Sequence, residues 1–300
     1  MEFICSDCPR HCGALRGEEI IGGICASPTL PVVARAAPHF GEEPCISGKR
    51  GSGTIFFSGC NLRCVFCQNH EISRPLSVGK AVSISQLRDI MLRLRDEGVH
   101  NINLVTPTHF SRAIAEALDG LELGIPVVWN SSGYESVETL RMLEGLVQVY
   151  MPDYKYADAE LARKYSAAPD YPERALEAIK EMVRQRGSYK LDADGMLVSG
   201  VLIRHLILPG QDLNSMLVID RISDTFPEST VLFSLMSQYT PMPGLEKFPE
   251  LQERVDSRSA QHLYKYMLRC GLTDGYWQDA SSATVEMIPD FDYTGIKMSD

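Results

Sequence analysis

Hydrophobic and polar positions follow two alternating patterns from residue 54 onward. Short β-branched or aromatic runs, typical of buried strands, are separated by stretches whose apolar residues recur every three or four positions, typical of amphipathic helices. The strand-like runs are residues 54–58, 101–106, 125–130, 148–153, 198–208 and 230–238. The helix-like stretches are residues 85–97, 111–118, 136–143, 158–165, 172–186 and 213–225. Strands that alternate with helices predict parallel βαβ units.

This alternation predicts an α/β fold, a partial (β/α)6 barrel of the TIM type. Residues 51–240 would form the barrel, residues 1–50 a cysteine-rich N-terminal segment made of loops, and residues 241–300 a C-terminal extension. The extension contains one more helical pattern at 257–270, followed by a polar, aromatic tail to which the pattern assigns no element. In such barrels the chemistry gathers at the carboxyl ends of the strands.

Polar residues stand where the predicted strands end. They are Thr106 and His109 after the second strand, Asn130 and Ser132 after the third, Asp153 and Lys155 after the fourth, and Gln238 at the end of the sixth. Arg204 and His205 are neighbours in the fifth strand. Because side chains alternate along a strand, only one of these two can face the barrel interior. We expect Arg204 to do so.

Charge and hydropathy exclude several classes of protein. The 29 Lys and Arg residues against 39 Asp and Glu residues give a net charge of −10, which argues against a general nucleic-acid binder. No uninterrupted apolar run approaches the ~18 residues of a membrane span. Met1 leads into a cysteine-rich segment without the pattern of a secretory signal. We therefore expect a cytoplasmic protein.

Seven of the nine cysteines fall into two tight groups. One group is Cys60, Cys64 and Cys67, and the other is Cys5, Cys8, Cys12 and Cys25. In a reducing compartment, clustered thiols are more often metal ligands or catalytic groups than disulfides. Cys45 stands alone and reads best as a small buried apolar side chain. Cys270 also stands alone, and the sequence does not decide whether it is a core residue or a catalytic one.

The loop from Gly59 to Cys67 has the spacing C-x3-C-x2-C. Three thiolates in one loop can each ligate one iron of a cubane [4Fe–4S] cluster. The fourth iron then keeps an open site, which a cluster needs if it is to carry out chemistry. A zinc site, or a four-cysteine electron-transfer cluster with a distant fourth ligand, is the alternative.

The N-terminal cysteines follow the spacing C-x2-C-x3-C-x12-C, which suits one tetrahedral site. Zinc accepts four thiolates, and so does an auxiliary iron–sulfur cluster. The segment has few apolar residues, so metal binding would supply much of its folding free energy. The site could be a structural staple, or it could take part in electron transfer or substrate contact.

Other polar residues are candidates of lower specificity. His39, Glu42 and Glu43, with Cys45, form a patch just before the first barrel strand. The patch could touch substrate at the barrel mouth, or it could be a surface salt-bridge cluster. His109 and His205 are candidates for acid–base or hydrogen-bonding roles.

Three stretches carry a family resemblance: residues 5–12, residues 39–48, and residues 51–69 with their three cysteines. With them the chain resembles radical S-adenosylmethionine (radical SAM) enzymes of the group of pyruvate formate-lyase activating enzymes, in a branch with an additional cysteine-rich N-terminus. The resemblance implies a [4Fe–4S] cluster on Cys60, Cys64 and Cys67 whose open iron is chelated by SAM. One-electron reduction then cleaves SAM to methionine and a 5′-deoxyadenosyl radical, which abstracts hydrogen from a substrate.

The resemblance also implies partners and an activity. The reductant would be a protein such as flavodoxin or ferredoxin, and the chain would act as a radical SAM oxidoreductase. Its substrate would be a glycyl-radical protein, which makes it an activase of the formate C-acetyltransferase-activating type. A small molecule or a peptide is the alternative substrate. A function of a different class is the further alternative: a non-radical iron–sulfur protein that carries electrons, or a binding module stabilised by zinc.

Several residues match SAM-binding positions of that family. Phe66 would pack near the adenine, the pair Asp153 and Lys155 matches a D-x-K pattern, and Arg204 matches an arginine near the SAM carboxylate. The rest of the expected SAM site is Thr106, Asn130, Ser132 and Gln238. From the residues alone, Asp153 and Lys155 could instead be a strand-end salt bridge, and Arg204 could neutralise a buried carboxylate.

The SAM site departs from the family pattern at three places. The relatives' Gly-Gly-Glu-type segment reads Thr106-Pro107-Thr108-His109, and their Asp-Thr-Asn-Gly turn reads Asn130-Ser131-Ser132-Gly133. Gln238 takes the place of a late histidine. We therefore expect a recognisable but reworked SAM site.

Overall fold

The computed structural model describes residues 2–73, 78–278 and 289–296, and its centre is a mostly parallel sheet. Six neighbouring parallel strands correspond to the six predicted from the hydrophobic pattern, which confirms the α/β fold. They are β4 (Ser52–Phe57), β6 (Ile102–Val105), β7 (Val127–Ser131), β8 (Val149–Pro152), β10 (Leu197–Leu206) and β11 (Leu232–Met236). Most of their side chains are buried, because helices and loops cover both faces of a parallel sheet.

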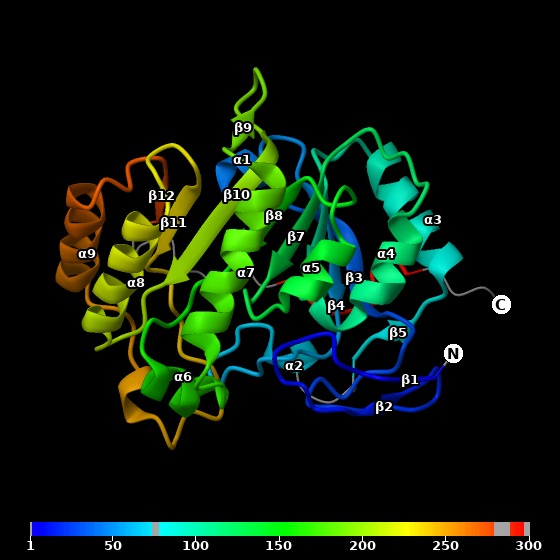
Figure 1. The fold of residues 1–300 in the computed structure, drawn as a ribbon, viewed down its shortest axis with the longest axis horizontal. Helices are drawn as coiled ribbons and strands as arrows, with labels where there is room; N and C mark the ends of the chain where they lie inside the picture. The colour runs from blue at the N-terminus through cyan, green and yellow to red at the C-terminus, as the bar shows by residue number, and fades with distance from the viewer. Residues whose placement is uncertain (1, 74–77, 279–288, 297–300) are drawn as a thin grey trace.

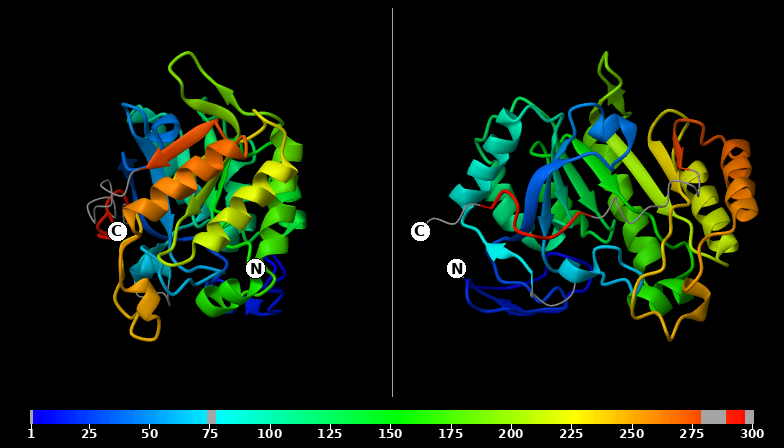
Figure 2. Two further views of the ribbon diagram at one scale, coloured as in Figure 1. Left: turned by 90° about the vertical axis from the view of Figure 1, so that its left-hand side faces the viewer. Right: turned by 180° about the vertical axis from the view of Figure 1, so that it is seen from behind.

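The predicted helices are also present. They are α3 (Ile84–Asp96), α4 (Ser111–Leu118), α5 (Val137–Met142), α6 (Ala159–Ser166), α7 (Tyr171–Arg186), α8 (Asp212–Thr225) and α9 (Ser257–Arg269). Local sequence fixes where they start. At α3, Ser83 Oγ accepts from the Gln86 backbone N–H while Gln86 Oε1 accepts from that of Ser83. Most of these helices line one side of the sheet, as Figures 1 and 2 show.

The expectation that residues 1–50 form only loops is wrong, because the segment contains three strands and a short helix, two of which contribute to the central part of the fold. Strand β3 (Val32–His39) runs antiparallel to β4, with His39 opposite Ser52, and helix α1 (Pro44–Ser47) follows it. β3 does not belong to the βα repeat, and Pro38 near its end weakened the strand pattern. Its far side pairs with β5 (Lys80–Ala81).

Smaller elements complete the fold. Strands β1 (Phe3–Ile4) and β2 (Leu15–Arg16) form a short antiparallel pair, and β9 (Lys190–Leu191) pairs with β10. Short helices are α2 (His70–Ser73), η1 (Thr108–Phe110) and η2 (Pro249–Leu251). In the tail, where no element was predicted, β12 (Gly275–Gln278) extends the sheet parallel to β11. The predicted C-terminal extension also includes residues 279–288 and 297–300, which lie outside the described residues.

The carboxyl ends of the parallel strands point toward the lower edge of the molecule in Figure 1. The N-terminal segment with β1 and β2 lies at this edge, as do α2 and α6. The chain therefore brings its first cysteine-rich segment to the end of the sheet where barrel chemistry is expected.

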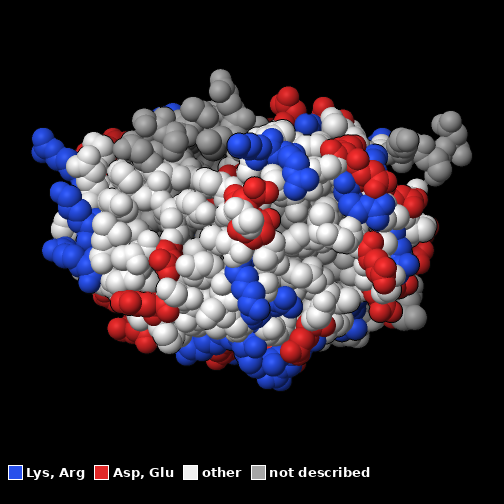
Figure 3. All heavy atoms as spheres, turned by 90° about the horizontal axis from the view of Figure 1, so that it is seen from above, with Lys and Arg blue, Asp and Glu red and all other residues white. Residues whose placement is uncertain are grey.

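The surface carries both signs of charge. On the face seen from above in Figure 3, Lys and Arg side chains are scattered among Asp and Glu side chains and form no continuous basic surface. None of the helices in the described part of the chain is long and apolar enough to cross a membrane.

Candidate functional site

The loop that follows β4 holds Cys60, Cys64 and Cys67 against one cavity of about 220 Å³. Cys60 and Cys64 are buried, and Cys67 is half-buried. Cys64 Sγ accepts a hydrogen bond from Ser166 Oγ at 3.1 Å, and Cys60 Sγ accepts one from the Leu62 backbone N–H at 3.3 Å. Donors aimed at sulfur stabilise a thiolate, which is the form that binds iron.

The environment of these thiols fits an iron–sulfur cluster. Burial, followed by the nearby Cys67, raises the pKa of Cys60 to about 12. Burial and then Cys64 raise the pKa of Cys67, while Lys155 acts in the opposite direction. Cys60 and Cys67 are therefore poor thiolates by themselves. Iron supplies the positive charge that coordination to thiolate requires.

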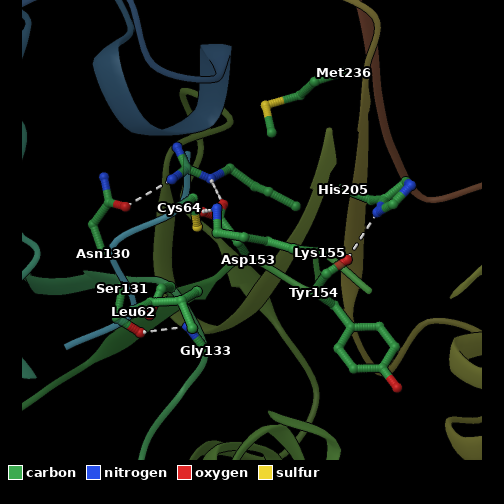
Figure 4. A network of polar contacts seen from close by, with 12 residues as sticks. Leu62, Cys64, Asn130, Ser131, Gly133, Asp153, Tyr154, Lys155, His205 and Met236 are labelled. Atoms are coloured by element: carbon green, nitrogen blue, oxygen red, sulfur yellow. Dashed lines mark hydrogen bonds and ion pairs between the residues drawn. The ribbon is translucent and has the colours of Figure 1, made fainter. Parts of the chain in front are cut away.

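All eight residues expected at the SAM site line the same cavity as the three cysteines. They are Phe66, Thr106, Asn130, Ser132, Asp153, Lys155, Arg204 and Gln238. They come from five different strand ends and the cysteine loop. Figure 4 shows Asn130, Asp153 and Lys155 gathered around Cys64, with Met236 at the far side of the space.

Two of these residues have buried polar atoms without a hydrogen-bond partner in the described structure. Ser132 Oγ and Gln238 Oε1 are buried and make no hydrogen bond to the described part of the chain. Thr106 has a φ of +58°, a left-handed conformation that a β-branched residue rarely adopts, at the point where β6 ends. Unsatisfied polar atoms and backbone strain concentrate where a protein binds a ligand, so this cavity fits a polar cofactor such as SAM.

Arg204 is the centre of the charge network on the cavity floor. Its guanidinium donates to Asp153 Oδ1 at 3.0 Å, to Glu42 Oε2 at 2.9 Å and to Asn130 Oδ1 at 2.7 Å. The Asp153, Glu43 and Glu42 carboxylates outweigh the effect of burial and raise the pKa of Arg204. Arg204 therefore neutralises buried carboxylates, as one of the sequence alternatives held, and it also lines the cavity.

Asp153 joins Arg204 to Lys155. Lys155 Nζ lies 2.5 Å from Asp153 Oδ2. Burial alone would raise the pKa of Asp153, but Lys155 and Arg204 outweigh it, and the net shift is downward. Asp153 is thus ionised at neutral pH. The predicted strand-end salt bridge exists, and both of its side chains still face the cavity.

Glu42 and Glu43 lie inside the molecule, so the interpretation of this patch as a surface cluster is wrong. The Glu42 side chain is 11% exposed and lines the cavity. Its Oε1 accepts from Asn103 and Asn130, each at 3.1 Å. Glu43 is buried, its carboxylate oxygens accept no hydrogen bond in the described structure, and its Oε2 lies 3.9 Å from Arg204 Nη1; burial raises its pKa. Their position within the stretch at 39–48 that carries the family resemblance is the signal that could have placed them.

The two histidines considered for acid–base roles, His109 and His205, do not line this cavity. His205 Nδ1 donates to the Tyr154 carbonyl at 2.8 Å, and its Nε2 lies 2.9 Å from Ser215 Oγ. Burial lowers the pKa of His205 to about 4, and that of His109 to about 3. Figure 4 shows His205 and Tyr154 directed away from Cys64. Arg204 faces the interior and His205 the opposite side, as the alternation predicted.

The two single cysteines lie elsewhere. Cys45 is buried, as expected, and burial raises its pKa to about 12. Cys270 is half-buried, packs against the main core, and has its Sγ 3.7 Å from Asp220 Oδ1. Since it does not line the cavity, its position favours the core over a catalytic role.

Cys5, Cys8, Cys12 and Cys25 line a second, smaller cavity together. Arg16, Asn61 and His109 also line it. Within the described ranges, no three His, Cys, Asp or Glu side chains are close enough together to hold a single metal ion. This holds for both cysteine groups, Cys60, Cys64 and Cys67 as well as the four N-terminal cysteines.

The comparisons with known proteins identify the family. A model of the radical SAM superfamily matches residues 54–219, more than half of the chain. This chain belongs to the radical SAM superfamily. Membership implies a [4Fe–4S] cluster and SAM as cofactors, in agreement with the prediction from the sequence.

One relative of this radical SAM protein covers most of the chain. An uncharacterised protein of Methanocaldococcus jannaschii is 32% identical over 227 residues, which are 72% of this chain and 61% of that relative. The chain thus spans less than two thirds of the relative's length.

Solved structures support the fold. SuiB of Streptococcus suis, bound to its precursor peptide SuiA, is 13% identical with a TM-score of 0.52, over 80% of this chain and 51% of SuiB. Methylornithine synthase (PylB) is 16% identical with a TM-score of 0.50, over 75% of this chain and 70% of that protein.

Proposed function

We propose that this protein is a radical SAM enzyme that abstracts a hydrogen atom from a substrate bound in the cavity beside Cys60, Cys64 and Cys67. When bound there, the [4Fe–4S] cluster and SAM supply a 5′-deoxyadenosyl radical. The observation that carries the proposal is the shared cavity: the three thiols and Phe66 of one loop and seven polar residues from five strand ends surround the same space.

The residues of the chain divide the work of binding. Lys155 donates one N–H to Asp153 and has two more that can bind the SAM carboxylate. Ser132 Oγ and Gln238 Oε1 would bind polar groups of SAM, and Phe66 would pack against its adenine. Arg204 holds Asp153 and Asn130 in place, because its guanidinium already donates to both.

The substrate is either a glycyl-radical protein or a small molecule or peptide. The sequence resemblance favours the activase reading. The similarity to SuiB, solved with a precursor peptide, and to methylornithine synthase favours the second reading. Glu42 supports it too, because a carboxylate on the cavity floor provides a polar anchor for a small substrate. We propose modification of a small molecule or peptide, with a reducing cytoplasm as its compartment.

An anaerobic assay tests the function. The protein is reconstituted with iron and sulfide, reduced and mixed with SAM, and 5′-deoxyadenosine is measured by mass spectrometry. Its formation supports the proposal. An intact cluster that neither forms the product nor changes its reduced EPR signal on addition of SAM would favour a non-radical electron carrier. Adding a glycyl-radical protein and looking for a glycyl-radical EPR signal separates the two substrate classes.

A further inference from the structure

A short chain of hydrogen bonds ends on the sulfur of Cys64. Ser166, the last residue of α6, donates from Oγ to Cys64 Sγ at 3.1 Å, and Tyr156 Oη lies 2.8 Å from the same Ser166 Oγ. All three residues are buried. Because burial keeps bulk water away, these polar groups have to satisfy one another.

The direction of this chain follows from the chemistry of a cluster ligand. A cysteine that binds iron is a thiolate, which accepts hydrogen bonds and has no hydrogen to donate. Ser166 has a single hydroxyl hydrogen, so once that hydrogen is given to Cys64 the Ser166 oxygen can only accept. Tyr156, whose phenol is protonated at neutral pH, must then be the donor. The hydrogen bonds therefore run from Tyr156 through Ser166 to Cys64.

Tyr156 directs the Ser166 hydroxyl toward the sulfur. A serine within a helix can instead turn its hydroxyl back to a carbonyl of the preceding turn. A hydrogen bond received from Tyr156 favours the rotamer in which the Ser166 hydrogen points at Cys64. Edge-on contacts of the Tyr156 ring with Phe66 and Tyr171, at centroid distances of 6.4 and 5.3 Å, hold the phenol in place.

The N-terminal segment holds the end of α6 against the cysteine loop through Arg10. The Arg10 guanidinium donates to the carbonyl of Leu62 at 3.1 Å in that loop and to the carbonyl of Ser166 at 2.8 Å. It also donates to the carbonyls of Asn61, at 2.9 Å, and Ala167. One planar cation thus bridges two backbone segments. A residue of the N-terminal segment therefore keeps Ser166 next to the loop.

The backbone adds a second tie at the same place. The Val65 N–H, in the middle of the cysteine loop, donates to the Tyr165 carbonyl at 2.9 Å. Helix α6 ends directly after Ser166, where Ala167 takes up a left-handed conformation with a φ of +48°. The end of the helix cannot move away from the cysteine loop without breaking these ties.

A hydrogen bond to a cluster sulfur changes how easily the cluster is reduced. The reduced form carries one more negative charge, which is shared with its sulfurs, so a donor stabilises it more than the oxidised form. Removing the donor therefore lowers the reduction potential. Cys60 Sγ receives its hydrogen bond from the Leu62 backbone N–H, which every side chain at that position retains except proline. At Cys64 the donor is a side chain, so the sequence can set its effect.

We propose that Tyr156 and Ser166 are positioning residues that raise the reduction potential of the [4Fe–4S] cluster through Cys64, and that Arg10 keeps Ser166 within reach of the sulfur. The inference deepens the proposed function, since it rests on the cluster of that site, but it requires no particular substrate. It gives the N-terminal segment a role at the radical SAM site. Reduction adds one electron from the reductant of the assay, and no bond of Ser166 or Tyr156 is made or broken.

A redox titration followed by EPR, without SAM or substrate, tests the proposal. The wild type, Ser166→Ala and Tyr156→Phe are reconstituted anaerobically with iron and sulfide, and their iron contents should be equal. At a fixed ambient potential, the ratio of reduced to oxidised cluster should fall about tenfold in Ser166→Ala, which is about 59 mV for a one-electron couple. Tyr156→Phe should give a smaller fall, about threefold, because Ser166 still donates in part of the molecules.

Ser223→Ala and Tyr150→Phe are the matched controls. Ser223 Oγ donates to the Asp220 carbonyl at 3.0 Å within α8, and the Tyr150 hydroxyl donates to Gln185 Oε1 at 2.6 Å. Neither residue lines the cavity of the cysteine loop, so both variants should titrate like the wild type. An unchanged titration of Ser166→Ala, or an equal shift in the controls, overturns the proposal.

Tyr156→Phe keeps the test decisive if Ser166→Ala holds less iron than the wild type. This variant leaves every atom of Ser166 and Cys64 in place and removes one hydroxyl oxygen. A ratio of reduced to oxidised cluster equal to that of the wild type then overturns the hydrogen-bond chain.

A double-variant cycle tests the part assigned to Arg10. Arg10→Met should lower the ratio of reduced to oxidised cluster, and Ser166→Ala/Arg10→Met should titrate like Ser166→Ala alone, because Arg10 acts through the Ser166 hydroxyl. Arg10→Lys, which keeps the charge but not the planar fork, replaces Arg10→Met in the cycle if that variant does not fold. Additive shifts, or no shift from Arg10, overturn its positioning role.

The inference and the proposed function fail in different ways. A wild type that forms no 5′-deoxyadenosine, while Ser166→Ala shifts the titration, overturns the proposed function and leaves the hydrogen-bond chain standing. A wild type that forms 5′-deoxyadenosine, while all variants titrate alike, overturns the chain and leaves the proposed function standing.

Discussion

Arg204 and Asp153 are joined twice at the carboxyl edge of the sheet. Their backbones form a parallel β-bridge between the ends of β10 and β8, and Arg204 Nε lies 3.0 Å from Asp153 Oδ1. The backbone contact fixes the separation of the two chains, so the side-chain ion pair needs little further ordering. A guanidinium held in this way can donate hydrogen bonds to Glu42 and Asn130 at the same time. Arg204 thereby organises the floor of the cavity beside Cys60, Cys64 and Cys67.

Replacing Arg204 should destabilise the fold. Arg204→Met removes the cation from a mostly buried network, in which Asp153 and Glu42 then face each other with Lys155 as the remaining partner. Breaking a buried ion pair in this way costs about 3–5 kcal/mol. Urea unfolding should show a loss of this size, and equilibrium dialysis should show weaker SAM binding.

The matched control for this prediction is Arg174→Met. Arg174 forms an exposed ion pair with Glu177 at 3.0 Å on helix α7, and exposed pairs contribute at most about 1 kcal/mol. A cost for Arg204→Met no larger than that of Arg174→Met would contradict the central role of Arg204.

Cys64→Ala should abolish SAM cleavage while the chain stays soluble and folded. The thiol lines the cavity and is one of three ligands expected for the cluster, so its loss leaves an iron without its protein ligand. Mass spectrometry of 5′-deoxyadenosine checks the activity, and far-UV circular dichroism checks the fold. Cys45→Ala, buried outside the cavity, serves as the control that keeps cleavage. Cleavage by Cys64→Ala would contradict the cluster assignment.

His205 should make stability depend on pH. Burial holds its folded-state pKa at about 4, below the value of about 6.5 expected in the unfolded chain. Between these values the unfolded state binds more protons, so the free energy of unfolding falls as the pH falls. From pH 7 to pH 5 the loss from this group amounts to about 2 kcal/mol.

The variant His205→Gln removes this titration. Urea unfolding at several pH values should give a shallower slope below pH 6.5 for His205→Gln than for the wild type. His262→Gln, on the exposed side of α9, should leave the slope as it is. An unchanged slope in His205→Gln would mean that His205 takes up its proton in the folded state as readily as in the unfolded one.

The barrel strands and their flanking helices could be predicted from the sequence because they repeat. Buried parallel strands appear as apolar runs and the helices between them have a helical period, so residues at successive strand ends share one edge. This logic correctly brought Thr106, Asn130, Asp153 and Gln238 together. It required no knowledge of which strand lies next to which.

Strand β3 and the position of Glu42 in the cavity were not predicted, because they do not belong to that repeat. β3 joins the sheet as an antiparallel neighbour of β4, and the turn after it carries Glu42 into the cavity. The ion pair between Glu42 and Arg204 spans 162 residues of sequence. Such a contact depends on the packing of the whole sheet, and no local pattern records it. The close approach of Cys25 to Gly59 could not be predicted for the same reason.

Gly59→Ala should disrupt the contact between the two cysteine groups. Gly59 has a φ of +87°, and a Cβ there would lie 2.5 Å from Ser27 Oγ and 2.8 Å from the Cys25 carbonyl. Gly98 has nearly the same φ, +85°, with no atom within 4 Å of its would-be Cβ. Both variants take on the backbone strain of about 1–2 kcal/mol. Only Gly59→Ala adds a clash with backbone.

The difference between the two variants therefore isolates the contact. Urea unfolding should show a cost for Gly59→Ala that exceeds that of Gly98→Ala by about 1–3 kcal/mol, in the range of overpacked sites. The clash pushes the segment around Cys25 away from the Cys60 loop. Iron analysis should accordingly show partial loss of metal in Gly59→Ala and full content in Gly98→Ala. Equal stability and equal iron in the two variants would mean that the N-terminal segment does not rest on Gly59 in solution.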